Sequence, residues 1–153
     1  MDDAEIRLWV AAIDSKESVA RDAAWERLRG LEERVLPFLQ EFFPRARRFE
    51  ARRDIAFRCI RYARNSEIAF EIGLAAIRDK SAVVRYRGCC ILAYSLRVEA
   101  VPPLRVLEKH ADARTVEDAR AAIDAIVHRN HHYFIDRGHS GQSFWEVRPG
   151  DLP

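Results

Sequence analysis

Successive helical segments of this chain are related by a step of 32 residues, and this internal repeat restricts the fold more than any other feature. Arg21, Arg53 and Arg85 keep this step. Three more columns keep it, made of small, large and aliphatic residues: Ala24, Ala56 and Gly88; Trp25, Phe57 and Cys89; Leu28, Ile60 and Leu92. A repeat of this length built from helix pairs is typical of an α-solenoid, because one pair cannot bury its apolar face alone. The small residues would let neighbouring helices approach closely.

The hydrophobic periodicity predicts a short first helix over residues 3–13, followed by helix pairs. The three predicted pairs cover 17–29 with 32–43, 50–64 with 67–78, and 81–97 with 99–110, and residues 115–129 begin a fourth. Gly30 and Pro44 are stop signals at the ends of two of these helices. The fourth copy departs from the pattern, since Val116 stands where an arginine is expected. Such departures are common in terminal repeats.

The end of the chain has a different pattern from the helices before it. Aromatic and β-branched residues flank a Gly-His-Ser-Gly turn at 138–141, which predicts two strands, over about 132–136 and 143–147. A lone hairpin is marginal in water, so we expect it to pack on the last helices. The predicted organisation is therefore a helical repeat domain over 1–130 and a hairpin with its tail over 131–153.

Composition restricts the class of protein. The chain has 153 residues, enough for one domain with a core, and a formal net charge of +2. This near balance argues against a protein that mainly coats nucleic acid. Cys59, Cys89 and Cys90 are an odd number of thiols in apolar stretches, so we expect free, buried cysteines. The sequence shows neither a signal peptide nor a membrane span, and we expect a cytoplasmic protein.

The segment 79–92 carries a resemblance to a known family. It reads Asp-Lys-Ser-Ala-Val-Val-Arg-Tyr-Arg-Gly-Cys-Cys-Ile-Leu, with an acidic residue at the turn, a Val-Arg pair, a small residue and a leucine. This segment resembles a HEAT repeat, and residues 18–24 are similar. The resemblance covers about 14–127. It implies a short right-handed α-solenoid that binds proteins, or less often nucleic acid, along one surface.

The same resemblance implies a ladder of acids and arginines between neighbouring repeats. Asp14 and Asp79 would be the acids, with Arg21 and Arg85 as their partners. The middle unit has Glu50 at a different offset, which interrupts the ladder. The alternative is that these arginines only cover the helix surface.

An arginine-rich stretch is the first candidate binding site. It contains Arg45, Arg47, Arg48, Arg52 and Arg53 with one acidic residue among them. Guanidinium groups bind carboxylates and phosphates alike, so the stretch suits an acidic protein or a nucleic-acid backbone. The alternative is a solvated turn followed by a helix start. Trp145 in the tail is a further candidate contact for a partner.

The histidine-rich tail raises the question of a metal. His128 and His132 would share a helix face if the last helix extended that far. No matching ligand pattern accompanies them, so we expect no metal and no cofactor. Asp136 is better placed to accept hydrogen bonds from backbone amides of the turn. No motif of a nucleophile, phosphate loop or metalloprotease occurs, and we expect no enzymatic activity.

Three functions are compatible with these features. The first is a protein-binding module, an inhibitor or immunity-type protein that neutralises a bacterial toxin; a generic scaffold or adaptor belongs to the same class. The second is nucleic-acid binding through residues 45–53, as in HEAT-like repair proteins. The third is a lyase-like HEAT protein acting on a chromophore, which would need a deep apolar groove.

Overall fold

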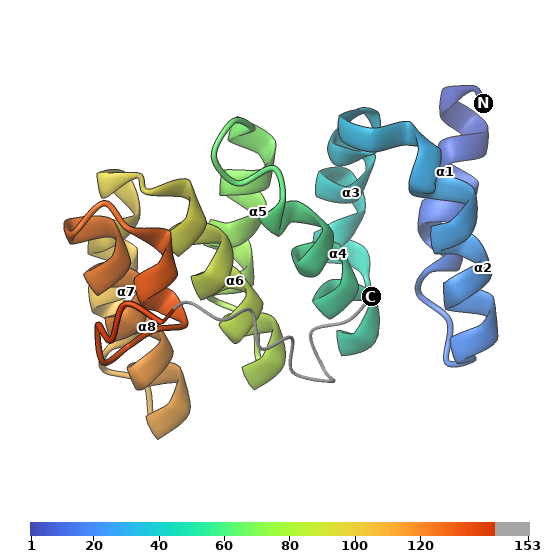
Figure 1. Cartoon of the computed structure of the whole chain (residues 1–153). Helices are drawn as coiled ribbons and strands as arrows, with labels where there is room; N and C mark the ends of the chain where they lie inside the picture. The colour runs from blue at the N-terminus through green and yellow to red at the C-terminus, as the bar shows by residue number, and fades with distance from the viewer. Residues whose placement is uncertain (143–153) are drawn as a thin grey trace. The chain divides into compact units, whose positions relative to one another are not determined.

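The computed structural model describes residues 1–142 of the chain, and these residues form helices (Figure 1). The described part contains α-helices and short 3-10 helices and no β-strand. The predicted all-α class is therefore confirmed. The contacts along the chain group residues 1–55 into one compact unit and residues from 56 onward into a second.

The first unit holds three α-helices and the start of a fourth. These are α1 (Asp3–Ala12), α2 (Ser18–Leu28), α3 (Leu36–Phe42) and the first part of α4 (Phe49–Ile60). Short 3-10 segments, η1 (Arg29–Val35) and η2 (Phe43–Arg45), flank α3. α1 packs against both α2 and α3, and its residues Ile6 and Val10 are buried.

The second unit contains the rest of α4 and four further α-helices. They are α5 (Glu67–Ala76), α6 (Ala82–Ser95), α7 (Val101–Leu107) and α8 (Ala113–Val127). A 3-10 turn, η3 (Val98–Ala100), leads into α7, and η4 (His131–Phe134) follows α8. α6 packs on α5 and α8, and α7 also packs on α8.

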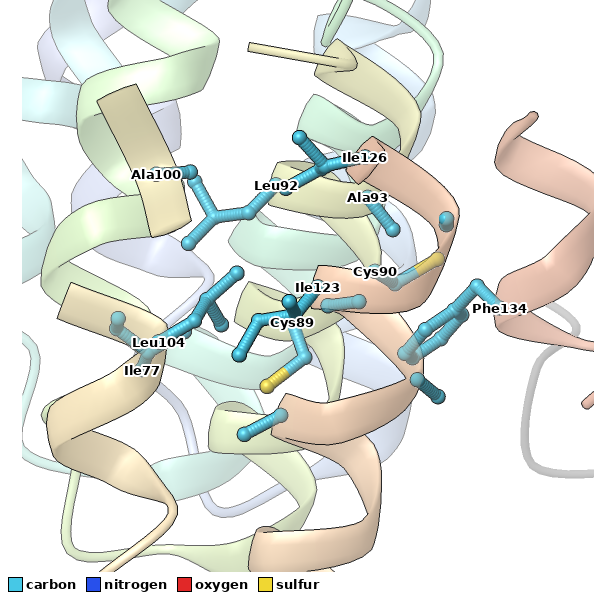
Figure 2. Packing of buried hydrophobic residues seen from close by; sticks show 14 of the residues in the cluster. Ile77, Cys89, Cys90, Leu92, Ala93, Ala100, Leu104, Ile123, Ile126 and Phe134 are labelled. Atoms are coloured by element: carbon cyan, nitrogen blue, oxygen red, sulfur yellow. The ribbon is translucent and has the colours of Figure 1, made fainter. Parts of the chain in front are cut away.

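The core of the second unit is built around α6. Figure 2 shows apolar side chains from α6, α7 and α8 meeting there, together with Phe134 from η4. Leu92, Leu104 and Phe134 have no exposed surface, and Ile126 has 1%. Because α6 has neighbours on two sides, residues on most of its circumference are buried.

Two glycines permit the close approach of α5 and α6. A Cβ on Gly88 would lie 2.7 Å from the backbone nitrogen of Ile77 and 2.9 Å from the carbonyl carbon of Ala76. A Cβ on Gly73 would lie 2.7 Å from Cγ2 of Ile91. Gly88, one member of the predicted column of small residues, therefore lies in a close helix contact that a side chain would prevent.

The first helix of the first pair ends within one residue of its predicted end, since α2 stops at Leu28. Gly30 does not end all helical structure, because the 3-10 turns of η1 continue past it, and the backbone leaves the helical region at Glu32, with a φ of 49° and a ψ of −130°. A glycine is a frequent stop signal but not a required one, because its φ can remain negative.

The first strand of the predicted hairpin is wrong, because residues 132–136 form η4 and the turn after it. The second predicted strand, 143–147, lies outside the described residues. The side-chain oxygen of Asn130 accepts a hydrogen bond from the amide of His132 and starts the 3-10 turn. Phe134 is then buried in the core, with its ring centroid 5.6 Å from that of Tyr86. Local capping and burial of one aromatic ring therefore outweigh the strand preference of this segment.

Candidate functional site

The arginine-rich stretch does not form one continuous surface. Arg45, Arg47 and Arg48 are exposed, whereas Arg52 is 7% exposed and Arg53 is half-buried. Nε of Arg53 lies 2.9 Å from Oδ1 of Asp54, and its guanidinium stacks over the ring of Phe49. Three of the five arginines in the stretch are thus exposed to solvent.

Arg45 belongs to a second arrangement that includes α1 and α3. Arg7 of α1 lies over the ring of Phe38, 5.1 Å from its centroid, and Arg45 lies over Phe42 at 5.8 Å. Glu41 sits between them, with Nε of Arg7 3.3 Å from Oε2 and Nη2 of Arg45 3.5 Å from Oε1. We call Arg7, Phe38, Glu41, Phe42 and Arg45 the arginine–phenylalanine surface.

This surface has a shallow depression of about 120 Å³, which Val10 and Ala11 also line. Sites for small molecules usually enclose about 300 Å³ or more. The depression is too small for a chromophore or a substrate of similar size. It has room for one or two side chains of a protein partner.

Hydrogen bonds hold the backbone of the exposed residues Arg47 and Arg48 in place. The two carboxylate oxygens of Asp14 accept hydrogen bonds from the amides of Arg47 and Arg48, each at 2.9 Å. Asp14 follows α1, 33 residues before Arg47, so it holds a turn far from it in sequence. The side chains of Arg47 and Arg48 therefore project from a defined position.

Three arginines share one structural role. Arg21, Arg52 and Arg85 each donate from Nη1 to the backbone carbonyl six residues earlier, on Ser15, Ala46 and Asp79, at 2.8, 2.9 and 2.9 Å. Each of these bonds ties the start of a helix to the turn that precedes it. The carbonyls of the turns are thus the acceptors of Arg21 and Arg85, where the ladder required carboxylates of Asp14 and Asp79.

In the last pair, α6 with α7, the same arginine also reaches α8. Nε of Arg85 donates to Oγ1 of Thr115 at 3.0 Å, and Nη2 lies 3.3 Å from Oδ2 of Asp112. Asp112 is the N-cap of α8, and the hydrogen bond from Thr115 is the main reason why the pKa of this carboxyl lies below its usual value. The Oδ1 atom of Asp79 accepts from the amide of Ser81 and closes its own turn.

Asp136 organises the turn after η4. Its Oδ1 accepts hydrogen bonds from the amide and the hydroxyl of Ser140, and its Oδ2 accepts from the amide of Gly141. These bonds lower the pKa of the carboxyl. Arg137 donates from Nη2 to Oδ1 of Asp118 at 2.9 Å and so joins the turn to α8. Trp145 lies outside the described residues.

The histidines are arranged differently from the predicted pair. α8 ends at Val127, so His128 and His132 do not share a helix face. His128 instead comes together with Asp124 of α8 and His139 of the turn, and one ligand atom from each lies within 4.8 Å of the others. The sequence signal for this cluster was the four-residue spacing of Asp124 and His128; the contribution of His139 depends on how the chain folds back.

The cysteines are unsuited to nucleophilic chemistry. Cys59, Cys89 and Cys90 are free and buried. Burial raises the pKa of the Cys59 thiol to about 12 and raises that of Cys89 as well. Because the thiolate is the nucleophile, a raised pKa makes the thiols of Cys59 and Cys89 poor nucleophiles in the folded protein.

No family model matches the sequence, and a search of curated proteins gives no significant match. In residues 1–142, no helix is long and apolar enough to cross a membrane.

Proposed function

We propose that this chain is a protein-binding helical-repeat module, and that its partner is a bacterial toxin that it inhibits. The observation that carries the proposal is the arginine–phenylalanine surface, where two arginines lie over two phenylalanine rings around a small depression. Arginines are among the usual energetic anchors of protein interfaces, and here the buried ring of Phe38 and the partly exposed ring of Phe42 support them from below.

The chemistry of this surface favours an acidic segment of the partner. Stacking on Phe38 and Phe42 holds the guanidinium planes of Arg7 and Arg45, so less conformational entropy is lost on binding. In the free protein, the carboxylate of Glu41 forms ion pairs with both arginines. A carboxylate of the partner would take its place or share the two guanidinium groups, and Arg47 and Arg48 would extend the positive charge.

Several features support a HEAT-like stack of helix pairs. The arginine that donates to the carbonyl six residues earlier recurs in three successive pairs, at Arg21, Arg52 and Arg85. Gly88 allows the close packing expected of such a column. Inhibition of a toxin rests on the resemblance of segments 79–92 and 18–24 to HEAT repeats, and the buried thiols favour binding over catalysis.

Nucleic-acid binding is the second candidate, favoured by the exposed side chains of Arg47 and Arg48. It is weaker because Arg52 is buried and cannot reach a phosphate backbone. Binding through phosphates would weaken steeply with added salt. A mobility shift with duplex or single-stranded DNA at low salt, lost on adding salt, would therefore favour this candidate over a protein partner.

A growth assay tests the proposed inhibition. The open reading frames on either side of the gene are expressed singly and then together with this chain. We expect one product to arrest growth, this chain to restore growth, and Arg45→Glu to lose the rescue because it repels an acidic partner. A matched control is Arg61→Glu, since Arg61 also lies over an aromatic ring, that of Tyr62, outside this surface. If no neighbour is toxic, or if Arg45→Glu rescues fully, the proposal is wrong.

A further inference from the structure

We propose that Asp124, His128 and His139 form a Zn²⁺ site that fastens the turn at 136–141 to the end of α8. Two imidazoles and one carboxylate are a common set of zinc ligands, with a fourth position open to water or another ligand. The three residues come from two segments, α8 with its C-cap and the turn after η4.

A nitrogen of each histidine contacts the carboxylate of Asp124, and Nδ1 of His128 also lies 2.9 Å from the backbone carbonyl oxygen of Asp124. Nδ1 of His128 lies 3.0 Å from Oδ1 of Asp124, and Nε2 of His139 contacts Oδ2 of the same side chain. Tetrahedral zinc with bonds of about 2.0–2.1 Å places its ligand atoms about 3.3 Å apart. All three atoms lie within 4.8 Å of one another, so their separations are of the order that such an ion requires.

The two imidazole rings are held in place by a tyrosine. The ring of Tyr133 stacks on His139 with centroids 3.8 Å apart and an angle of 9°, and it meets the edge of His128 at 5.6 Å. Residues that orient metal ligands contribute substantially to metal affinity. The site is thus partly ordered before an ion arrives.

The backbone of His139 adds a second constraint. This residue has a φ of 52°, in the left-handed region that non-glycine residues seldom occupy. Its amide donates to the carbonyl of Asp136, whose carboxylate also holds the amides of Ser140 and Gly141. The turn therefore keeps the imidazole of His139 aimed at α8.

The position suits a cation. Asp124 and His128 lie at the C-terminus of α8, where the unpaired carbonyls carry partial negative charge. One carboxylate supplies formal negative charge, and the partly exposed ligands allow an ion to enter from solvent. Imidazole nitrogens favour Zn²⁺ over Mg²⁺ or Ca²⁺, which prefer oxygen ligands.

Isothermal titration of the full chain with Zn²⁺, without a histidine tag and at about pH 7.5, tests the site. We expect one Zn²⁺ per chain, and Co²⁺ in its place should show visible bands of a four-coordinate ion. His139→Ala and His128→Ala should each lower the affinity at least about tenfold. His132→Ala is the matched control and should bind as the wild type does, because His132 lies outside the cluster.

Thermal unfolding provides a second reading that does not depend on the titration. Zn²⁺ should raise the midpoint of the wild type and of His132→Ala, but not that of His139→Ala. Circular dichroism shows whether each variant is folded. The proposal is overturned if the wild type binds no Zn²⁺, which would leave a histidine–carboxylate contact only. It is also overturned if both histidine variants bind Zn²⁺ as tightly as the wild type.

Discussion

Arg52 and Arg53 are adjacent in the sequence but have different roles. Arg52 is buried and donates to the carbonyl of Ala46, whereas Arg53 is half-buried beside Asp54. The uniform 32-residue step selects Arg53 for the repeated column, yet the structure places Arg52 there. What recurs in each pair is the sequence separation between the arginine and the carbonyl that accepts its hydrogen bond, which is six residues. Two neighbouring arginines cannot be told apart by a repeat of residue types.

This difference predicts unequal effects on stability. Arg52→Ala leaves a carbonyl without its donor and removes a buried side chain, so we expect a loss of about 2 kcal/mol in the free energy of unfolding. Arg53→Ala removes a partly exposed ion pair and should cost less than about 1 kcal/mol. Urea unfolding of the two variants measures both values. Equal losses would contradict the assigned roles.

Single residues of the sequence predict the arginine–phenylalanine surface only in part. The arginine-rich stretch pointed to Arg45, but Arg7 and Phe38 come from other helices. Their approach depends on the packing of α1 against α3. The metal-ligand cluster has the same origin, since His139 reaches Asp124 through the turn that Asp136 holds.

At the scale of the elements, the hydrophobic periodicity predicted the helices well and the tail poorly. α5 and α6 lie within the predicted ranges 67–78 and 81–97, and α4 begins one residue before the predicted range 50–64. Apolar residues that recur with the helical period indicate the buried face of a helix directly. The segment 132–136 has no such period, and its conformation depends on the cap at Asn130 and on the burial of Phe134.

The packing of α5 on α6 gives a test at Gly88. Gly88→Ala places a Cβ against the backbone at Ala76 and Ile77, which cannot move aside as a flexible side chain could. We expect a loss of about 1–3 kcal/mol in the free energy of unfolding, despite the higher helix propensity of alanine. Gly30→Ala is the control, because nothing lies within 4 Å of its Cβ and it should be neutral or stabilising. A neutral Gly88→Ala would contradict the close approach.

The contact between His131 of η4 and Arg64 predicts that the free energy of unfolding depends on pH. Burial, and then His132 and Arg64, lower the pKa of this histidine, and Nη2 of Arg64 lies 3.1 Å from its Nδ1. In the neutral ring Nδ1 can accept a hydrogen bond from the guanidinium, whereas protonation places two cations together.

Because the folded pKa is lower than the unfolded one, the unfolded state binds more protons between them. The free energy of unfolding should therefore fall as the pH drops below about 6.5 and level off below the folded pKa. His131→Asn should reduce this slope, and His132→Asn should reduce it less, because burial is the larger cause of the lowered pKa. Denaturant unfolding at several pH values measures the slopes, and an unchanged slope in His131→Asn would refute the prediction.

At the scale of the whole molecule, the described chain forms two compact helical units with different candidate sites. The arginine–phenylalanine surface belongs to residues 1–55, and the cluster of Asp124, His128 and His139 belongs to the second unit. Loss of Zn²⁺ binding would therefore leave the proposed interface with its residues intact. The two proposals can be tested independently.

The most direct measurement for the proposed function is the dissociation constant of the complex with the toxin found by the growth assay. Calorimetry at about 150 mM salt compares the wild type, the double variant Arg7→Ala with Arg45→Ala, and Arg61→Ala. We predict at least about a tenfold weaker complex for the double variant, equivalent to about 1.4 kcal/mol, and no change for Arg61→Ala. A double variant that binds as tightly as the wild type would contradict the assignment of this surface.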